Sequence, residues 1–321
     1  MQLIGSANAD VGMDVAWETL LADASAMDAV EAGIRVVEDN AQDHTVGYGG
    51  YPNIRGKVEL DASIMEGTHR KAGAVGALRG YRAAVTVARA VLERLPHVLV
   101  VGEGASLLAE EIGLPQEELL TPEAQATWRG GVERVQGDLG NLTTIAAVHQ
   151  VIGEIFDPEA PPKAGEPQLA PGGTVNLIAV DRAGRIASAV STSGWAWKYP
   201  GRLGDTPVIG AGNYCDDRYG AAACTGWGEL TIRAGTARSV VAGLASGLPL
   251  EDACRAAMRD LVGLEADEPG SRGYVNLVAV DRRGKHFAMT TKPGTEYVWR
   301  AEHMAGARRE LRQLVDARAD S

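Results

Sequence analysis

The run Gly173-Thr174-Val175-Asn176-Leu177-Ile178-Ala179-Val180-Asp181 is strongly β-forming, and a Gly-containing turn at 182–185 leads from it to a second strand at 186–191. β-branched and aliphatic residues bounded by turn residues are typical of a hairpin. A similar run, Gly273-Tyr274-Val275-Asn276-Leu277-Val278-Ala279-Val280-Asp281, follows one hundred residues later. We therefore expect two similar hairpins in one layered fold, and Thr174 is where the first copy departs from the second.

Strands and helices alternate on the N-terminal side of this hairpin. Ser25 and Asp28 form a capping-box-like start for a helix that reaches about Asn40. Periodicity predicts the other elements, which are helices at 14–22, 85–95 and 105–112 and strands at 58–65 and 98–101. Between the two hairpins we expect a loop-rich, Gly-rich segment at 193–228, then helices at 237–246 and 250–264.

The segment from Phe156 to Gly173 differs in composition from the rest of the chain. It holds five of the 14 prolines, mixed with Gly, Ala and Glu. Such a composition is typical of a flexible linker. The predicted linker ends where the first hairpin begins.

The overall composition excludes several classes of function. A chain of 321 residues with a net charge of −11 lacks the basic excess that nucleic-acid backbones require. No stretch approaches the ~20 apolar residues of a membrane span, and no secretory leader is visible, so we expect a soluble, cytoplasmic chain. Three cysteines without a C-x-x-C spacing and six dispersed histidines predict no disulfide framework, no metal site and no cofactor.

Thr174 lies at the junction between the predicted linker and a buried-looking strand. A chain that cuts itself there would expose Thr174 as an N-terminal nucleophile. Its free α-amine, with a pKa near 7.7–8.0, could then take the proton of its own hydroxyl. Gly173 would tolerate the strained backbone that such a cut needs. The alternative is an ordinary β-branched residue that opens a strand.

Two further pairs of residues could complete a site. Arg202 and Asp205 lie three apart in a Gly-bounded turn, where they could hold a carboxylate and an ammonium group, or could form a solvated ion pair. Thr225 and Gly226 lie among small residues, where a hydroxyl and a backbone N–H could form an oxyanion hole. The alternative for this second pair is a small-residue turn packed under a helix.

Longer motifs around these positions resemble the glycosylasparaginase family, within the N-terminal-nucleophile asparaginases that include isoaspartyl peptidases. The motifs that carry the resemblance cover most of the chain; they are Asp28-Ala29-Val30-Glu31-Ala32-Gly33, Val46-Gly47-Tyr48-Gly49-Gly50, Leu60-Asp61-Ala62-Ser63-Ile64-Met65, Pro96-His97-Val98, Val101-Gly102-Glu103-Gly104-Ala105 and Gly201-Arg202-Leu203-Gly204-Asp205-Thr206-Pro207 through Gly212.

The resemblance implies an α/β (α+β) fold, the four-layer αββα sandwich, with residues 1–321 as one domain. It also implies cleavage between Gly173 and Thr174 into chains of 173 and 148 residues, and a homodimer of the processed protomers. The substrate would be a small β-aspartyl amide, which Thr174 attacks at its side-chain amide to form a β-aspartyl ester that water then hydrolyses.

The resemblance assigns a role to each candidate residue. Thr174 matches the nucleophile, and Thr192 matches the threonine that hydrogen-bonds to it. Arg202 and Asp205 match the residues that hold the α-carboxylate and α-ammonium of the substrate. Thr225 and Gly226 match the oxyanion-hole donors.

Three departures from the family pattern bear on cleavage and substrate. Gly172-Gly173 precede Thr174 where the family usually has His-Asp, and Ala7 stands where glycosylasparaginases carry a tryptophan. The His-Gly-Gly-Ala-Gly start of the isoaspartyl branch is missing, whereas the loop from Trp195 to Gly201 resembles the glycosylasparaginase version. The alternatives are an isoaspartyl peptidase or L-asparaginase with the same site, or an uncleaved, non-enzymatic amino-acid-binding protein.

The mixed-charge run Arg308-Arg309-Glu310-Leu311-Arg312 lies near the C-terminal end of the chain. Alternating basic and acidic residues are typical of a solvated helix face. We therefore expect this run to be the solvated face of a helix.

Overall fold

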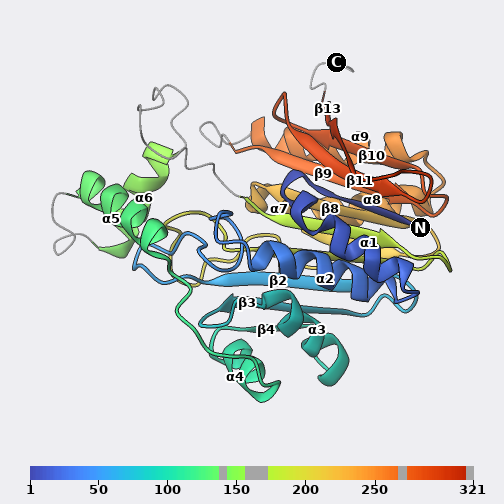
Figure 1. Ribbon diagram of the computed structural model, residues 1–321. Helices are drawn as coiled ribbons and strands as arrows, with labels where there is room; N and C mark the ends of the chain where they lie inside the picture. Colours follow the sequence, from blue (N-terminus) through green and yellow to red (C-terminus); the bar gives the residue numbers. More distant parts are fainter. Residues whose placement is uncertain (137–142, 156–172, 267–272, 316–321) are drawn as a thin grey trace.

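The computed structural model describes residues 1–136, 143–155, 173–266 and 273–315, and Figure 1 shows a mixed α/β arrangement of two sheets and helices. Of the predicted linker at 156–173, all but Gly173 lies outside the described residues.

The larger sheet has eight strands in the order β12-β11-β1-β5-β6-β2-β3-β4. Its neighbours pair antiparallel except β3 and β4, which are parallel. The strands are β1 (Gln2–Ser6), β2 (Leu60–Glu66), β3 (Ala72–Leu78), β4 (Leu99–Val101), β5 (Val175–Val180), β6 (Ile186–Thr192), β11 (Glu296–Ala301) and β12 (Arg308–Leu311).

The smaller sheet has five strands in the order β13-β10-β9-β8-β7. Its neighbours pair antiparallel except β10 and β13. The strands are β7 (Asn213–Asp216), β8 (Gly220–Gly226), β9 (Val275–Asp281), β10 (His286–Thr290) and β13 (Gln313–Leu314). The last two strands of the described chain, β12 and β13, therefore lie in different sheets.

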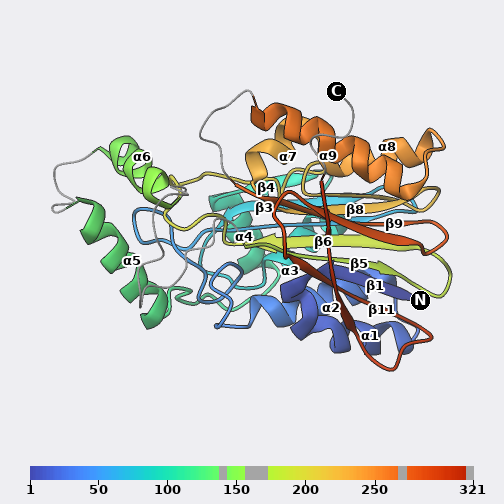
Figure 2. The ribbon, with the colours of Figure 1, turned by 90° about the horizontal axis from the view of Figure 1, so that it is seen from above.

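Helices cover the outer faces of the two sheets, and Figure 2 shows the strands between the two groups of helices. The larger sheet is covered by α1 (Met13–Leu21), which follows the short η1 (Ala7–Gly12), and by α2 (Ala26–Glu38), α3 (Ala84–Arg94) and α4 (Glu103–Glu111). The smaller sheet is covered by α7 (Gly228–Ala234), α8 (Thr236–Ala245) and α9 (Leu250–Ala266). The pair α5 (Pro122–Gln136) and α6 (Thr144–Ile155) lies to one side of both sheets.

Three apolar clusters hold these layers together. One joins α1, α2 and α3 to the larger sheet, and another joins α7, α8 and α9 to the smaller sheet. The third lies between the sheets, where Ile178 and Val190 from one sheet face Val278 and Val280 from the other. Strands β5 and β9 are buried on both faces for this reason, which explains their nearly continuous aliphatic sequences.

The structure confirms the predicted capping box and both hairpins. Ser25 Oγ accepts from the backbone N–H of Asp28 at 3.1 Å, while Asp28 Oδ2 accepts from the N–H of Ser25 at 3.0 Å. The first hairpin is β5 with β6 in the larger sheet, and the second is β9 with β10 in the smaller sheet.

One sequence prediction is incomplete and one is wrong. The segment at 193–228 is largely loop up to residue 212, as expected, but it also contains β7 and the fully buried β8. The sequence of β8, Gly-Ala-Ala-Ala-Cys-Thr-Gly, carries little β signal because tight packing between layers selects small residues. The run from Arg308 to Arg312 is not a solvated helix face: it forms edge strand β12 and then buries Arg312. Antiparallel pairing with the preceding strand, β11, overrides the local charge pattern.

Candidate active site

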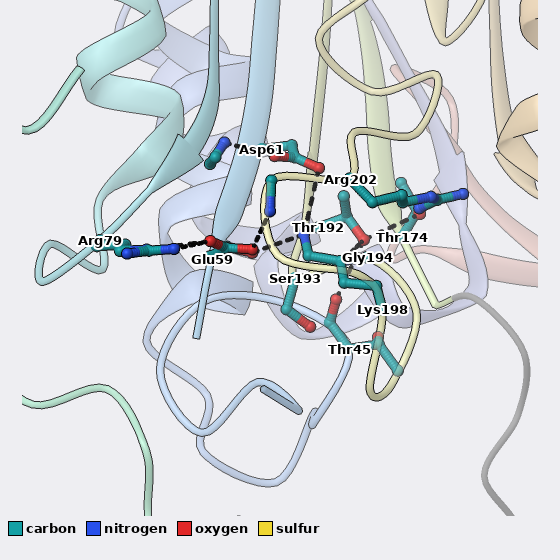
Figure 3. Close-up of polar contacts among 12 residues, drawn as sticks. Thr45, Glu59, Asp61, Arg79, Thr174, Thr192, Ser193, Gly194, Lys198 and Arg202 are labelled. Carbon is teal, nitrogen blue, oxygen red and sulfur yellow. Dashed lines mark hydrogen bonds and ion pairs between the residues drawn. The ribbon is translucent and has the colours of Figure 1, made fainter. Parts of the chain in front are cut away.

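Thr174 and Thr192 lie next to each other at one end of the first hairpin. The register of β5 and β6 pairs Val175 with Ser191, so the next pair along the ladder is Thr174 and Thr192. Thr174 Oγ1 donates to Thr192 Oγ1 at 3.3 Å, and both residues are buried. Figure 3 shows the two side chains with Thr45 close by.

The Thr192 hydroxyl links the nucleophile candidate to the peptide bond that precedes it. Thr192 Oγ1 donates to the carbonyl oxygen of Gly173 at 2.7 Å and lies 3.3 Å from that of Thr45. The same oxygen accepts from the backbone N–H of Gly194 at 2.9 Å. One hydroxyl therefore contacts both the Gly173 carbonyl and the Thr174 hydroxyl.

Gly173 packs directly against Thr45. A β-carbon at Gly173 would overlap the Thr45 side chain, so this close approach requires glycine. Thr45 is itself held by Asp43, whose Oδ1 accepts from both the Thr45 hydroxyl and its backbone N–H. Asn8 Nδ2 donates to the other oxygen of Asp43 at 2.8 Å.

Thr225 is positioned by the second hairpin. The register of β8 and β9 pairs Thr225 with Asn276, whose Nδ2 donates to Thr225 Oγ1 at 3.3 Å. Asn276 Oδ1 accepts from Thr290 Oγ1 at 2.8 Å and from Thr295 Oγ1 at 3.2 Å, which fixes the orientation of its amide. Because Thr225 Oγ1 accepts from Asn276, its own proton remains available for a substrate oxygen.

Asp205 is a buried carboxylate close to the end of β8, which carries Thr225 and Gly226. A β-carbon at Gly228 would lie 2.7 Å from the Asp205 backbone nitrogen, so the two segments touch at this glycine. Burial raises the pKa of Asp205 to about 6, while Thr231 and Arg202 oppose the shift. Asp205 Oδ2 is buried without a hydrogen-bond partner within the described ranges. A buried anion with a free oxygen suits an incoming cation.

Arg202 is engaged by Glu229 in the first turn of α7. Arg202 Nε and Nη2 donate to Glu229 Oε1 at 2.9 and 2.7 Å, and Nη2 also reaches Oε2 at 2.7 Å. The guanidinium carbon lies 4.3 Å from the centroid of the Trp195 ring. The geometry shows that Arg202 already binds a carboxylate in the fork-like manner that a substrate carboxylate would use.

A buried ionic cluster anchors the loop between β6 and β7 (Figure 3). Lys198 Nζ donates to the carbonyl oxygen of Glu59 at 3.1 Å and lies 3.7 Å from Asp61 Oδ2. Burial lowers the pKa of Lys198, and Asp61 opposes that shift. The Glu59 side chain accepts from the backbone N–H of Gly201 at 3.0 Å, which fixes the start of the turn that carries Arg202.

A cavity of about 550 Å³ opens at Thr174 and Thr225. Its wall includes Gly173 and Thr45, Ala7 and Asn8 from the N-terminal segment, and Tyr274, Asn276 and Arg312 from the C-terminal segment. Ala7 therefore lines the same cavity as the candidate nucleophile, and a tryptophan in its place would occupy part of that space. The other four candidate residues (Thr192, Arg202, Asp205, Gly226) do not line this cavity.

The described part of the chain contains no cluster of three or more His, Cys, Asp or Glu residues that could hold a metal ion. Nor does it contain a helix with the length and apolar character of a membrane span. The chemistry that the site can support comes from hydroxyls, backbone donors and charged side chains. These groups suit attack on a carbonyl carbon, with donors for the oxyanion.

Sequence reasoning missed three residues that contact the candidate site, namely Thr45, Glu229 and Asn276. Asn276 had a signal, because asparagine occupies the same position in both hairpins, at 176 and 276. Thr45 and Glu229 are brought in by tertiary packing from distant segments, and spacing along the chain does not reveal such contacts.

Comparison with known proteins places these residues in a wider context. The sequence profile described as asparaginase matches residues 8–307. The chain is 33% identical over 288 residues to an N(4)-(β-N-acetylglucosaminyl)-L-asparaginase of Elizabethkingia miricola, covering 88% of this chain and 76% of that protein.

Two mouse proteins are also similar. An N(4)-(β-N-acetylglucosaminyl)-L-asparaginase of Mus musculus is 37% identical over 233 residues, which cover 68% of this chain and 65% of the relative. An isoaspartyl peptidase/L-asparaginase of Mus musculus is 34% identical over 280 residues, which cover 86% of this chain and 75% of the relative. Relatives with different substrate names thus lie at similar distances from this chain.

Proposed function

The chain belongs to the asparaginase family of N-terminal-nucleophile amidohydrolases, and from this premise we propose that it hydrolyses the β-amide of an aspartyl substrate of the N(4)-(β-N-acetylglucosaminyl)-L-asparagine type. The observation that carries the proposal is the contact among Gly173, Thr174 and Thr192. There the Thr192 hydroxyl is hydrogen-bonded to the Gly173 carbonyl oxygen, which belongs to the peptide bond that would be cut, and to the Thr174 hydroxyl, which would attack that carbonyl carbon.

The proposal extends to the fold and to maturation. The helix, sheet, sheet, helix order would be the four-layer αββα sandwich of N-terminal-nucleophile hydrolases, formed by residues 1–321 as one domain. The chain would be cleaved after Gly173 into chains 1–173 and 174–321, and two processed protomers would associate as a dimer.

Maturation would begin with attack of Thr174 Oγ1 on the carbonyl carbon of Gly173. The hydrogen bond from Thr192 to that carbonyl oxygen stabilises the negative charge that develops there. The carbon–nitrogen bond then breaks as the departing nitrogen takes the proton of the Thr174 hydroxyl, and an ester links Gly173 to the Thr174 side chain. Water hydrolyses this ester and leaves Thr174 with a free α-amine.

Substrate hydrolysis would then proceed in two steps. The Thr174 α-amine takes the proton of its own hydroxyl, and the oxygen attacks the β-carbonyl carbon of the substrate. Thr225 Oγ1 and the backbone N–H of Gly226 donate to the oxyanion, and the amine departs with the proton. Water, activated by the same α-amine, hydrolyses the β-aspartyl ester and releases aspartate.

Arg202 and Asp205 would hold the α-carboxylate and α-ammonium of the substrate. The free oxygen of Asp205 supports this role, as does the ability of Arg202 to bind a carboxylate with two of its nitrogens. Both residues lie on the loop that the Lys198 and Glu59 contacts fix, so the aspartyl end would bind to a rigid frame.

A substrate panel tests the proposed function directly. We expect processed protein to release ammonia or amine from a glycosylated asparagine, a β-aspartyl dipeptide and L-asparagine, with the highest kcat/KM for the glycosylated substrate. A higher kcat/KM for the dipeptide or for asparagine would favour the isoaspartyl peptidase or L-asparaginase alternative. Aspartate binding in calorimetry without turnover of any member of the panel would contradict the proposal and favour a non-enzymatic binding protein.

The pH dependence of aspartate binding should report the ionisation of Asp205. Because burial raises the pKa of Asp205 to about 6, its charged form is lost as the pH falls through that value. Binding of an ammonium requires the charged form, so the inhibition constant of L-aspartate should rise about tenfold per pH unit below pH 6. The Asp205→Asn variant should bind weakly and without this dependence. A wild-type inhibition constant that stays flat down to pH 5 would contradict the assignment.

Removal of the Glu229 carboxylate should strengthen substrate binding. In Glu229→Gln the neutral amide binds Arg202 more weakly than the carboxylate does, so a substrate carboxylate displaces it from Arg202 more easily. We expect KM to fall about three- to tenfold, with little change in kcat. Glu251→Gln is a matched control, since Glu251 lies in the first turn of α9 and pairs with Lys285. A rise in KM for Glu229→Gln alone would show that Glu229 is needed to position Arg202.

A further inference from the structure

Arg312 is a buried cation in the wall of the cavity that opens at Thr174. Arg312 comes directly after the last residue of β12 and is only 7% exposed. Nη1 donates to the carbonyl oxygen of Glu296, whereas Nε and Nη2 are buried without a hydrogen-bond partner in the described ranges. Burial lowers the pKa of Arg312 to about 10, which still leaves the guanidinium charged at neutral pH.

Arg309, three residues earlier, lines the same cavity in a different electrostatic state. Its Nη2 donates to Asp10 Oδ2 at 2.8 Å, and its Nη1 lies 3.7 Å from Glu296 Oε2. Two carboxylates therefore balance Arg309, while no carboxylate of the described chain lies within 4.0 Å of the Arg312 guanidinium nitrogens. A buried unpaired guanidinium is costly, and an anionic ligand would remove that cost.

The position of the cavity relative to Arg202 and Asp205, the proposed aspartyl-binding residues, indicates which part of a substrate would reach Arg312. The cavity contains Thr174 and Thr225, at which the amide bond would be cut, but its wall does not include Arg202 or Asp205. With the aspartyl group on those two residues, the cavity receives the amine side of the amide. A volume of about 550 Å³ accommodates an amino-acid-sized leaving group.

We infer that Arg312 forms a subsite for an anionic group on the leaving amine, so that the cavity accepts β-aspartyl amides whose amine carries a carboxylate. This inference rests on the proposed function. Nε and Nη2 present the two parallel donors that a carboxylate pairs with. Since both nitrogens are covered in the substrate-free chain, the ligand must displace the side chains that shield them. Amides with a neutral leaving group, glycosylamines among them, would still be cleaved, without this contact.

A pair of substrates that differ only in this charge tests the inference. We expect processed wild-type protein to cleave β-aspartyl-leucine with a kcat/KM at least about tenfold above that of its C-terminal amide. Arg312→Met keeps much of the side-chain volume without the charge and should reduce that preference about 10- to 100-fold. Most of the loss should fall on KM for the free dipeptide. Arg312→Lys should restore part of the preference.

Arg308→Gln is the matched control, because it removes the same charge from an exposed position of β12 that does not line the cavity. We expect it to leave the ratio between the two substrates unchanged. Equal cleavage of the two substrates by wild-type protein, or an equal loss on both in Arg312→Met, would overturn the subsite. Turnover of neither dipeptide nor any other β-aspartyl amide would overturn the proposed function together with it.

Discussion

Thr174→Ala is expected to remain a single chain of full length and to lose turnover of every β-aspartyl amide. The variant lacks the oxygen that would attack both the Gly173 carbonyl and the substrate. Deletion of a catalytic nucleophile typically lowers kcat by about 10⁴-fold or more. Denaturing gels and intact-mass measurements show whether the chain has been cut. Wild-type protein should give fragments of 173 and 148 residues.

Thr174→Ser separates the loss of the hydroxyl from the loss of side-chain volume. It keeps the oxygen and removes only a methyl group, so we expect the two fragments to form, at a reduced rate. A Thr174→Ala sample that is still cut between residues 173 and 174, or that keeps the wild-type turnover, would show that another group is the nucleophile.

The elements that the sequence predicts well are those whose determinants are local. Ser25 and Asp28 lie three residues apart and cap α2 by direct contact, so the pattern and the structure agree. The two hairpins are also predictable from the sequence, because aliphatic strands and Gly-containing turns lie next to each other in the chain. The register that the structure shows for the first hairpin places Thr174 beside Thr192, a residue that the sequence indicated only through the family resemblance.

The elements that the sequence did not predict depend on packing between distant segments. Strand β8 consists of Gly, Ala, Cys and Thr because α8 and the opposite sheet press on its two faces, and small residues lower its local β signal. Arg312 lies in a charged run that is typical of a solvated surface, yet strand pairing and the cavity wall bury it. The Glu229 contact with Arg202 spans 27 residues and a helix start, which no spacing rule covers.

The contrast between local motifs and packing of distant segments matters most for predicting the leaving group of the substrate. The aspartyl side of the proposed site lies on residues whose motifs are visible in the sequence, namely Arg202 and Asp205. The amine side is lined by Ala7, Tyr274 and Arg312, which belong to segments far apart in the chain and meet only in the folded protein. Substrate class therefore depends on the part of the site that sequence motifs describe least.

Thr192→Val should slow cleavage of the chain by about 100- to 1000-fold, the usual cost of removing one oxyanion donor. Valine has nearly the same shape as threonine, so the β-branched packing of β6 persists while the hydroxyl is lost. The Gly173 carbonyl then loses the donor at 2.7 Å that would stabilise its developing charge. A time course of fragment formation on denaturing gels, started from freshly purified protein, measures the rate.

The same substitution also affects stability, and the two effects can be told apart. The backbone N–H of Gly194 loses its acceptor at 2.9 Å, which should lower the free energy of unfolding by about 1–3 kcal/mol. Ser193→Ala removes the neighbouring buried hydroxyl, which lies 3.4 Å from the His44 carbonyl oxygen and does not contact Gly173. That control should lose some stability but cleave at nearly the wild-type rate.

Thr192→Ser completes the series because it keeps the hydroxyl and lacks only the methyl group. We expect it to cleave within about tenfold of the wild-type rate, which would tie the loss in Thr192→Val to the hydroxyl and not to packing. Cleavage of Thr192→Val at the wild-type rate would contradict the role of Thr192 in maturation. Cleavage would free the Gly173 carbonyl from this hydroxyl, and the proton of Thr192 would then become available to the new amine and hydroxyl of Thr174. A processed enzyme that carried the Thr192→Val change should therefore also turn over substrate more slowly.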